Sequence, residues 1–229
     1  SHAFIPDARR NGAKYVIGQL DATSIVEADL LVGNSRAIIG PMASVLEGFP
    51  SRKMSLVGIT GTNGKTSVSY LYSAMVQEQK SHCFTMGTTG ILLNGEKEAD
   101  SQTTPDPLTL QNALANFLRD GVKYGAMEVS SHALDQFRVL GTWFSAVAFT
   151  NFSQDHLDYH KNMEAYFQAK ARLFTSQYSK TAVVNIDDPK GPSIVEIARE
   201  NGVEVIEVST SNEESNVYLR STKSDLDGI

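Results

Sequence analysis

The chain has 229 residues, of which 41% are hydrophobic and 20% are charged, as in ordinary globular proteins. Its net charge of -6 and the lack of a basic stripe argue against a general nucleic-acid-binding protein and against docking on anionic membranes. No apolar run approaches the roughly 18 residues of a membrane span, and no signal peptide is visible. Cys83 is the single cysteine, so an intrachain disulfide is impossible and we expect a cytoplasmic protein.

The first fifty residues predict two helices and two short apolar segments. Residues 4–18 predict a short helix followed by a strand, residues 28–34 form a second apolar run, and residues 35–49 fit a helix. The stretch GFPSRK (48–53) combines glycine, proline and two cations, which makes it the best candidate for a linker. Both chain ends look cut, because no methionine opens the chain and the last residues predict a strand and a turn that lead onward. We therefore expect a piece of a longer protein.

After the linker, strands and helices alternate. Strands are predicted at residues 54–60, 82–87, 124–130, 144–152, 181–186 and 203–209. Helices are predicted at residues 65–79, 106–121, 163–176 and 191–201, and a surface loop at 209–216. This alternation predicts an α/β fold of the P-loop type, with a mostly parallel sheet and helices on both faces. In such folds the ligands bind at the carboxyl ends of the strands.

The stretch SLVGITGTNGKTS joins the first of these strands to its helix and reads as a phosphate-binding loop. The strict pattern G-x-x-x-x-G-K-[ST] fails, because Ile59 stands where it requires glycine. Gly61 and Gly64 would let the backbone approach phosphate oxygens. Lys65 and Thr66 would begin the helix, where lysine can reach phosphate and threonine can bind Mg²⁺. The alternative, a glycine-rich turn with a solvated lysine, is disfavoured by the flanking strand and helix.

Polar residues follow two further predicted strands. Thr103 and Thr104 precede a helix, where they could contact phosphate or simply cap the helix, and taken alone capping is favoured. Glu128 ends a strand, where a P-loop fold needs a partner for Mg²⁺. Three more residues offer polar groups to an anionic substrate: Ser130, Gln136 and Arg138. For Arg138 the alternative is a surface ion pair.

A cluster of acidic residues and histidines follows the next strand: Asp155, His156, Asp158 and His160. Its D-H-x-D-x-H spacing invites a zinc site, but a hard cation at an ATP site fits better. Lys170 lies in the helix beyond, where a solvated lysine is the usual interpretation. Its spacing, however, puts it on the face formed by Tyr166, Phe167, Leu173 and Phe174. We therefore expect Lys170 to be buried near Glu128 and His156.

Together, the stretches GITGTNGKTS, TTPDPLTL, MEVSSHALDQFRV, TNFSQDHLDYH and AKARLF resemble the MurE family of Mur ligases, the UDP-N-acetylmuramoyl-tripeptide synthetases. The resemblance covers nearly the whole chain, and the EVSSHALDQFRV stretch is specific within the superfamily. It implies that residues 1–52 are the later part of an N-terminal UDP-MurNAc-binding domain. Residues 53–229 would be the central ATP-binding domain, possibly incomplete at its C-terminal end. The start of the first domain and the C-terminal domain would be missing.

The resemblance also implies roles for single residues. ATP phosphates would be held by Gly61, Thr62, Asn63, Gly64, Lys65 and Thr66, with Asn151 near the adenine. The UDP-sugar peptide would contact Thr103, Thr104, Ser130, Gln136 and Arg138. Magnesium would be held by Thr66, Glu128, His156 and Lys170, the lysine as a carbamate formed with CO₂. Catalysis would then rest on Lys65, Glu128, His156 and Lys170.

The implied activity is ATP- and Mg²⁺-dependent ligation in peptidoglycan synthesis. The enzyme would add meso-diaminopimelate or L-lysine to UDP-MurNAc-L-Ala-D-Glu through an acyl-phosphate, and the residues that choose between them would lie beyond Ile229. We expect a monomer without nucleic-acid or membrane partners, and we expect the 229-residue chain alone to be inactive. The alternatives are a folylpolyglutamate-type ligase, which shares the G-x-x-G-x-x-G-K-T loop, and a non-catalytic scaffold.

Overall fold

A computed structural model of the chain describes residues 2–20 and 27–222. Its main feature is a sheet of nine strands in the order β11-β10-β9-β8-β3-β7-β4-β5-β6. The strands are β3 (Ser55–Thr60), β4 (Cys83–Gly87), β5 (Gly90–Leu93), β6 (Glu96–Ala99), β7 (Tyr124–Glu128), β8 (Ala146–Phe149), β9 (Thr181–Asn185), β10 (Glu204–Ser209) and β11 (Val217–Tyr218). All neighbours are parallel except β4–β5 and β5–β6. The predicted mostly parallel α/β fold is confirmed.

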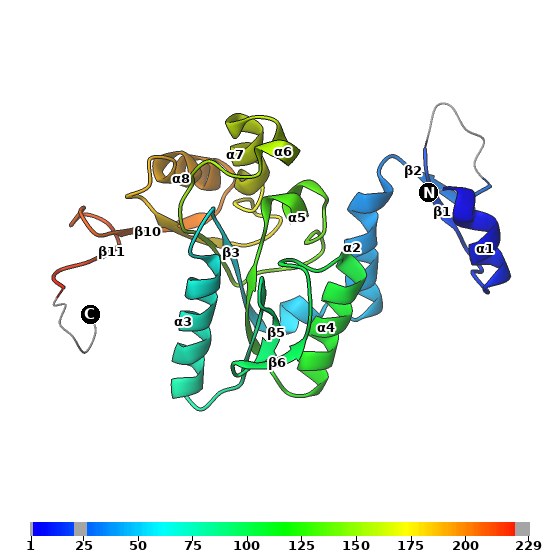
Figure 1. Cartoon of the computed structure of the whole chain (residues 1–229), viewed down its shortest axis with the longest axis horizontal. Coiled ribbons are helices and arrows are strands. Elements are labelled where there is room, and N and C mark those ends of the chain that lie inside the picture. Colours follow the sequence, from blue (N-terminus) through cyan, green and yellow to red (C-terminus); the bar gives the residue numbers. More distant parts are fainter. Residues whose placement is uncertain (1, 21–26, 223–229) are drawn as a thin grey trace.

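The helices that connect these strands are α3 (Lys65–Glu78), α4 (Pro107–Arg119), α5 (Ser131–Asp135), α6 (Leu157–His160), α7 (Met163–Ala171) and α8 (Gly191–Glu200). Figure 1 shows α3 and α4 on opposite sides of the sheet. Asp106 begins α4, because its carboxylate accepts hydrogen bonds from the Leu108 and Thr109 N–H groups at 3.0 and 3.1 Å. None of the helices in the described part of the chain is long and apolar enough to cross a membrane.

The hydrophobic core lies between the sheet and its helices. Its most deeply buried members are Leu56, Phe84, Met86, Leu110, Leu114, Met127, Phe144 and Phe174. The prediction extended α7 to residue 176, but the helix ends at Ala171. The N–H groups of Leu173 and Phe174 instead bond to the carbonyls of Lys170 and Ala171 in a tighter turn. This turn carries Leu173 and Phe174 into the core.

A small lobe precedes the sheet and stands apart from it in Figure 1. It contains a 3₁₀ turn η1 (His2–Phe4), α1 (Ile5–Arg10) and two parallel strands, β1 (Ile17–Gln19) and β2 (Leu30–Val32). The following helix α2 (Ser35–Leu46) lies against α4, and its first residue, Ser35, donates to Gln19 Oε1 of β1 at 3.1 and 3.2 Å. The sequence predicted this helix to residue 49, but Gly48 and Phe49 adopt left-handed backbone conformations, with φ of 71° and 58°, which end it.

Helix α2 meets the segment after Arg138 backbone to backbone. A Cβ atom on Gly40 would lie 2.0 Å from the Leu140 carbonyl oxygen, and one on Gly141 would lie 2.7 Å from the Pro41 nitrogen. Only glycine allows so close an approach. The predicted linker then forms a 3₁₀ turn η2 (Pro50–Lys53), and its buried Ser51 accepts a hydrogen bond from the Trp143 N–H at 2.9 Å. The predicted boundary after residue 52 therefore falls within packed structure.

The segment at residues 219–229 was predicted to be a strand and a turn. The strand lies slightly earlier, as β11, and residues 219–222 are not in a strand. The remainder of that prediction, residues 223–229, lies outside the described residues.

Candidate active site

The loop between β3 and α3 is shaped by its two glycines. Gly61 and Gly64 have φ of 149° and 82°, where other residues are strained. A Cβ atom on Gly61 would lie 1.9 Å from Thr150 Oγ1. No side chain caps α3, so the backbone N–H groups of its first turn are free to meet an anion. The loop therefore has the geometry of a phosphate-binding loop despite its unusual glycine spacing.

Lys65 is the first residue of α3, and its side chain folds back over the loop. Its Nζ donates to the carbonyl oxygens of Gly61 and Thr62 at 3.0 and 2.8 Å. Burial lowers the pKa of this ammonium group, while the negative charges of Glu128 and Asp155 partly oppose that shift. The interpretation of Lys65 as a solvated lysine is thus wrong.

Asn151 holds the other side of the loop. Its Oδ1 accepts from the Asn63 N–H at 2.9 Å, and its Nδ2 donates to the Asn63 carbonyl oxygen at 3.1 Å. Thr150 Oγ1 donates to the same carbonyl at 2.6 Å, and the Thr62 N–H donates to the Asn151 carbonyl at 2.9 Å. The segment after β8 therefore fixes the loop conformation, a role for Asn151 that its predicted position near adenine did not anticipate.

Glu128 is buried at the carboxyl end of β7, beside the start of α3. Its Oε1 accepts from Thr66 Oγ1 at 2.7 Å and from the Thr88 N–H at 3.1 Å, and its Oε2 accepts from Thr88 Oγ1 at 3.1 Å. Gly87 makes room for the carboxylate, since a Cβ atom there would lie 2.1 Å from Oε1. The predicted pair of Thr66 and Glu128 is thus brought into direct contact.

Lys170 is 1% exposed, so the predicted burial is confirmed and the solvated alternative is wrong. Its Nζ donates to the Gly61 carbonyl oxygen at 2.7 Å, the same oxygen that Lys65 contacts, and lies 4.6 Å from the centre of the Tyr166 ring. Burial, with a smaller contribution from the nearby Lys65 charge, lowers the pKa of Lys170 to about 7, while Asp155 opposes the shift. A substantial fraction of the amine is therefore uncharged near neutral pH.

This pKa predicts a pH dependence of stability. Between pH 7 and the ordinary lysine value of 10.5, the unfolded chain carries a proton at Lys170 that the native chain lacks. The free energy of unfolding should therefore rise with pH across this window, by at most about 1.4 kcal/mol per pH unit, whereas below it the cost of the buried charge is fully present. We expect urea unfolding at a series of pH values to show this rise relative to Lys170→Met. Parallel profiles for the two proteins would contradict the low pKa.

His156 forms no hydrogen bond or ion pair with Glu128 among the described residues. Its ring is 42% exposed, its Nε2 is 3.4 Å from Asp155 Oδ2, and it packs edge-on against His132 and Tyr166. Tyr166 connects this group to the loop, because its hydroxyl lies 3.3 Å from Thr62 Oγ1. Within the described residues, no group of three or more His, Cys, Asp or Glu side chains is arranged to hold a metal ion.

Four of the five residues predicted to bind substrate, Thr104, Ser130, Gln136 and Arg138, form one network around the half-buried Arg138. Its guanidinium group donates to Gln136 Oε1 at 2.7 and 2.9 Å, to Gln102 Oε1 at 2.5 Å and to the Thr104 carbonyl oxygen at 3.1 Å. All these partners are neutral, and Arg138 forms no ion pair with a described carboxylate, so the surface ion-pair alternative is wrong. Its positive charge therefore remains available to an anionic ligand.

The two threonines tie this network to Glu128. Thr104 Oγ1 donates to the Glu128 carbonyl at 2.8 Å and accepts from the Ser130 N–H at 3.0 Å. Thr103 Oγ1 lies 3.4 Å from Thr88 Oγ1. Because Asp106 caps α4, the interpretation of these threonines as helix caps is wrong. Ser130 instead caps α5, accepting from the Ala133 N–H at 3.2 Å.

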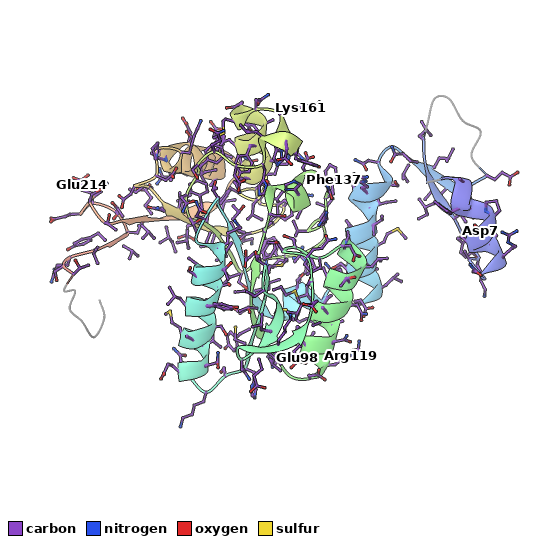
Figure 2. The ribbon with its side chains drawn as sticks, viewed as in Figure 1. Asp7, Glu98, Arg119, Phe137, Lys161 and Glu214 are labelled. Carbon is purple, nitrogen blue, oxygen red and sulfur yellow. The ribbon has the colours of Figure 1, made fainter. Side chains whose placement is uncertain are left out.

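Several residues of the site escaped the sequence analysis. Thr88 contacts Glu128, Thr150 contacts the loop and Tyr166 contacts Lys170, but the sequence assigned none of the three a role in the site. In Figure 2, Phe137 and Lys161 are labelled at the top of the view, on the side of α5 and α6, and Glu98 and Arg119 at the bottom.

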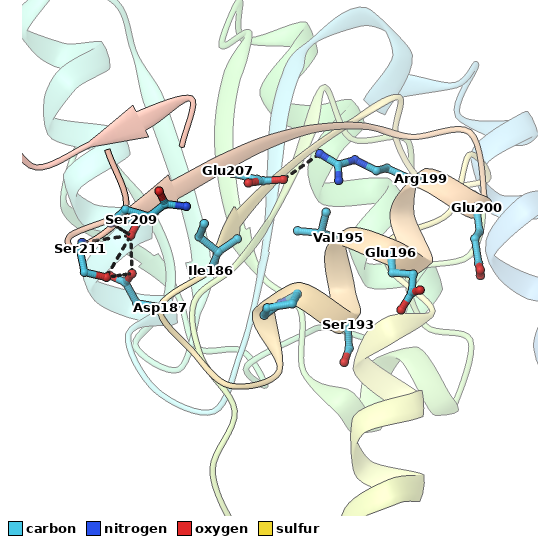
Figure 3. Close-up of a pocket in the computed structure, with 12 residues that line it drawn as sticks. Ile186, Asp187, Ser193, Val195, Glu196, Arg199, Glu200, Glu207, Ser209 and Ser211 are labelled. Atoms are coloured by element: carbon cyan, nitrogen blue, oxygen red, sulfur yellow. Dashed lines mark hydrogen bonds and ion pairs between the residues drawn. The ribbon is translucent and has the colours of Figure 1, made fainter. Parts of the chain in front are cut away.

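A separate hollow lies beside the same edge of the sheet, between α8 and β10 (Figure 3). Asp187 organises its rim, accepting from the Thr210 N–H at 2.7 Å and from the Ser209, Thr210 and Ser211 hydroxyls. These bonds lower the pKa of Asp187. Arg199 pairs with Glu207 across the wall at 2.7 Å. The Asp187 carboxylate thus already has hydrogen-bond partners within the protein, in the turn at residues 209–211.

The mostly parallel sheet, with a glycine loop at its carboxyl edge, defines an α/β protein of the P-loop type. The Mur ligase middle domain matches residues 59–229, and the chain belongs to the Mur ligase family. It is 41% identical over 196 residues to the UDP-N-acetylmuramoyl-L-alanyl-D-glutamate--2,6-diaminopimelate ligase of Aquifex aeolicus (strain VF5), covering 86% of this chain and 40% of that protein. It is 37% identical over 231 residues to the ligase of the same name from Pseudomonas syringae pv. tomato, covering 99% and 47%.

Solved structures agree with this assignment. A structure of a UDP-N-acetylmuramoyl-L-alanyl-D-glutamate--2,6-diaminopimelate ligase matches with a TM-score of 0.84 and 30% identity, covering 99% of this chain and 46% of that one. A folylpolyglutamate synthase from Mycobacterium tuberculosis matches with a TM-score of 0.60 and 16% identity over 77% of this chain, which shows a shared fold. The chain spans less than half the length of the ligases described here.

Proposed function

We propose that the chain carries the phosphate site and part of the acceptor site of an ATP-dependent ligase acting on UDP-MurNAc-L-Ala-D-Glu. Residues 1–52 would belong to the UDP-MurNAc-binding domain and residues 53–229 to the ATP-binding domain. The observation that carries the proposal is the contact between Thr66 and the buried Glu128, directly beside the glycine loop and its two lysines. The relatives' names favour 2,6-diaminopimelate over L-lysine as the added amino acid.

The loop would bind the phosphates of ATP. The free N–H groups at the start of α3 and the glycine backbone suit phosphate oxygens, and Lys65 is within one side-chain rotation of them. The hydrogen bonds from Thr150 and Asn151 would keep the loop in this shape before the nucleotide binds. This lowers the entropy cost of ordering the loop on binding.

The donor set fits Mg²⁺. A hydroxyl and a buried carboxylate in contact are hard oxygen ligands, so Thr66 and Glu128 would hold the ion, with His156 and a carbamylated Lys170 completing the set. A bound Mg²⁺ would neutralise developing negative charge on the transferred phosphate. Carbamate formation requires an uncharged amine, and the lowered pKa of Lys170 supplies one.

The acceptor would be held by Arg138 and its neighbours. The positive charge of Arg138 contacts only neutral oxygens, so it suits a carboxylate or phosphate of the UDP-sugar peptide. Thr103, Thr104, Ser130 and Gln136 would contact the same ligand. The terminal carboxylate would receive the γ-phosphoryl group, and the amine of the incoming amino acid would displace phosphate. Lys65 would stabilise the negative charge that gathers between the two substrates.

The test of this function is ligation by the full-length protein. Incubation with ATP, UDP-MurNAc-L-Ala-D-Glu and radiolabelled meso-diaminopimelate should give a labelled tripeptide and release ADP and phosphate. Two parallel reactions test the alternatives: one replaces meso-diaminopimelate with L-lysine, and the other supplies glutamate together with a folate acceptor. Product only with the folate acceptor, or no product with any of them, would refute the proposal.

We place the enzyme in the cytoplasm as a monomer.

Arg138→Ala in the full-length protein should weaken UDP-MurNAc-dipeptide binding by about tenfold or more, and ADP binding far less. The reason is that the guanidinium lies in the network around Thr104 and Gln136, not on the glycine loop. Calorimetry with each ligand measures both losses, and Arg119→Ala is a matched arginine control, since its guanidinium bonds to Ala115 and Asn116 of its own helix. Equal losses for the two ligands would exclude the assigned role.

A further inference from the structure

A small hollow lies at the amino ends of the strands, at the edge of the sheet opposite the glycine loop. Its walls come from α2, from η2, which precedes β3, and from the segment that precedes β8. Its lining residues include Ser44, Phe49, Arg52, Leu140 and Trp143. Its volume of about 260 Å³ lies just below the range of pockets that hold drug-sized ligands, so it has room for a molecule of one ring. Because the hollow shares no residue with the site described above, the following inference is independent of the proposed function.

Two aromatic side chains give the hollow flat apolar surfaces. Trp143 forms part of one wall, and Phe49 lies 46% exposed at its rim. Phe49 holds φ of 58°, a conformation that is strained for a bulky residue and that persists only when its surroundings enforce it. Flat aromatic walls favour a planar ring, which can stack against them.

One cation faces this aromatic wall. The Arg52 guanidinium carbon lies 4.9 Å from the centre of the Trp143 ring. Arg52 is the only ionisable side chain among the described residues that line the hollow, and it forms no ion pair with a described carboxylate. A carboxylate on the ligand would therefore meet an uncompensated positive charge with bidentate geometry available.

A buried hydroxyl completes the site. Ser44 lines the hollow, is 1% exposed, and its Oγ has no hydrogen-bond partner. A buried polar atom without a partner costs free energy, and rotation of this hydroxyl toward a ligand atom in the hollow would relieve that cost. The hydroxyl of Thr142, by contrast, already accepts from Gln111 Nε2 at 2.8 Å.

From these features we propose that the hollow is a binding site for a small aromatic carboxylate. The ring would stack against Trp143 and Phe49, the carboxylate would pair with Arg52, and Ser44 would donate a hydrogen bond. Such a ligand would bridge α2 and the segment 140–143, which continues directly from Arg138.

The chain provides its own probe, because Trp143 is its single tryptophan. Titration of the 229-residue protein with benzoate should change the tryptophan fluorescence in a saturable way. Cyclohexanecarboxylate, which keeps the charge but not the flat ring, and benzamide, which keeps the ring but not the charge, should each bind at least about tenfold more weakly. Equal midpoints for the three probes, or no saturable change with benzoate, would overturn the proposal.

Three variants locate the site. Arg52→Met keeps an unbranched stem beside Trp143 and should weaken benzoate binding by about tenfold or more, while Lys53→Met, which removes the neighbouring cation outside the hollow, should leave the midpoint unchanged. Ser44→Ala should weaken binding by about threefold, yet raise the melting temperature of the free protein because it removes an unpartnered buried hydroxyl. Equal effects of Arg52→Met and Lys53→Met would show nonspecific charge attraction and overturn the assignment.

Discussion

Replacing Lys65 with alanine should lower ligation by the full-length protein about a hundredfold or more, which is typical for the loss of one group that stabilises transition-state charge. In the structure Lys65 contacts two loop carbonyls and no part of the hydrophobic core, so the fold should survive. The variant's melting temperature and its turnover, measured together, separate the two effects.

The matched control for this variant is Lys80→Ala. Lys80 is exposed just beyond the other end of α3. The variant therefore removes the same charge near the same helix without touching the loop. Its ligation rate should equal that of the unmodified protein. Near-normal turnover by Lys65→Ala would rule out the phosphate role of the loop.

Lys170→Ala should also lose ligation by about a hundredfold or more, and a short carboxylate such as propionate should restore part of the activity. The physical reason is that a buried amine beside the glycine loop would act as a carbamate, and a free carboxylate can supply the same oxygen ligands. Steady-state assays with and without propionate measure the rescue.

Because Lys170 fills space beside Tyr166, its loss could act through packing. Lys170→Met keeps most of the volume and removes the buried charge, so we expect a melting temperature at least as high as that of the unmodified protein, with no ligation activity. Lys161→Ala, at the exposed end of α6, is the matched lysine control and should keep full activity. If Lys170→Met remained active, the carbamate role would be wrong and Lys170 would have a structural role only.

Periodic and local signals predicted most of the fold. The strand–loop–helix order around Lys65 follows from residues close in sequence, and the burial of Lys170 follows from its spacing to the apolar residues of α7. The hairpin of β5 and β6 was missed although a signal was present. Asn94 and Gly95 form its turn with φ of 52° and 88°, and Asn-Gly between strand-like segments is the usual sequence of such a turn.

The contacts within the site could not be predicted in the same way. Tyr166 meets Thr62 across 104 positions of the chain, and Thr150 meets Asn63 across 87. Nothing in the sequence marks Tyr166 or Thr150 as a partner of the glycine loop. Their roles arise when the parallel sheet brings the ends of β3 and β8 together, which no local pattern encodes. For His156, the sequence placed a residue in the right loop but could not give the direction of its ring.

The backbone contact of Gly40 with Leu140 has a mechanical consequence for the small lobe. Because the two chains touch without side chains between them, α2 cannot rock against the central sheet without a collision. Any rotation of the lobe formed by α1, β1 and β2 must break the two hydrogen bonds from Ser35 to Gln19 and be taken up at the exposed Gly33 and Asn34. Helix α2 then moves with the central sheet as one unit, and the lobe would turn about a pivot of two residues.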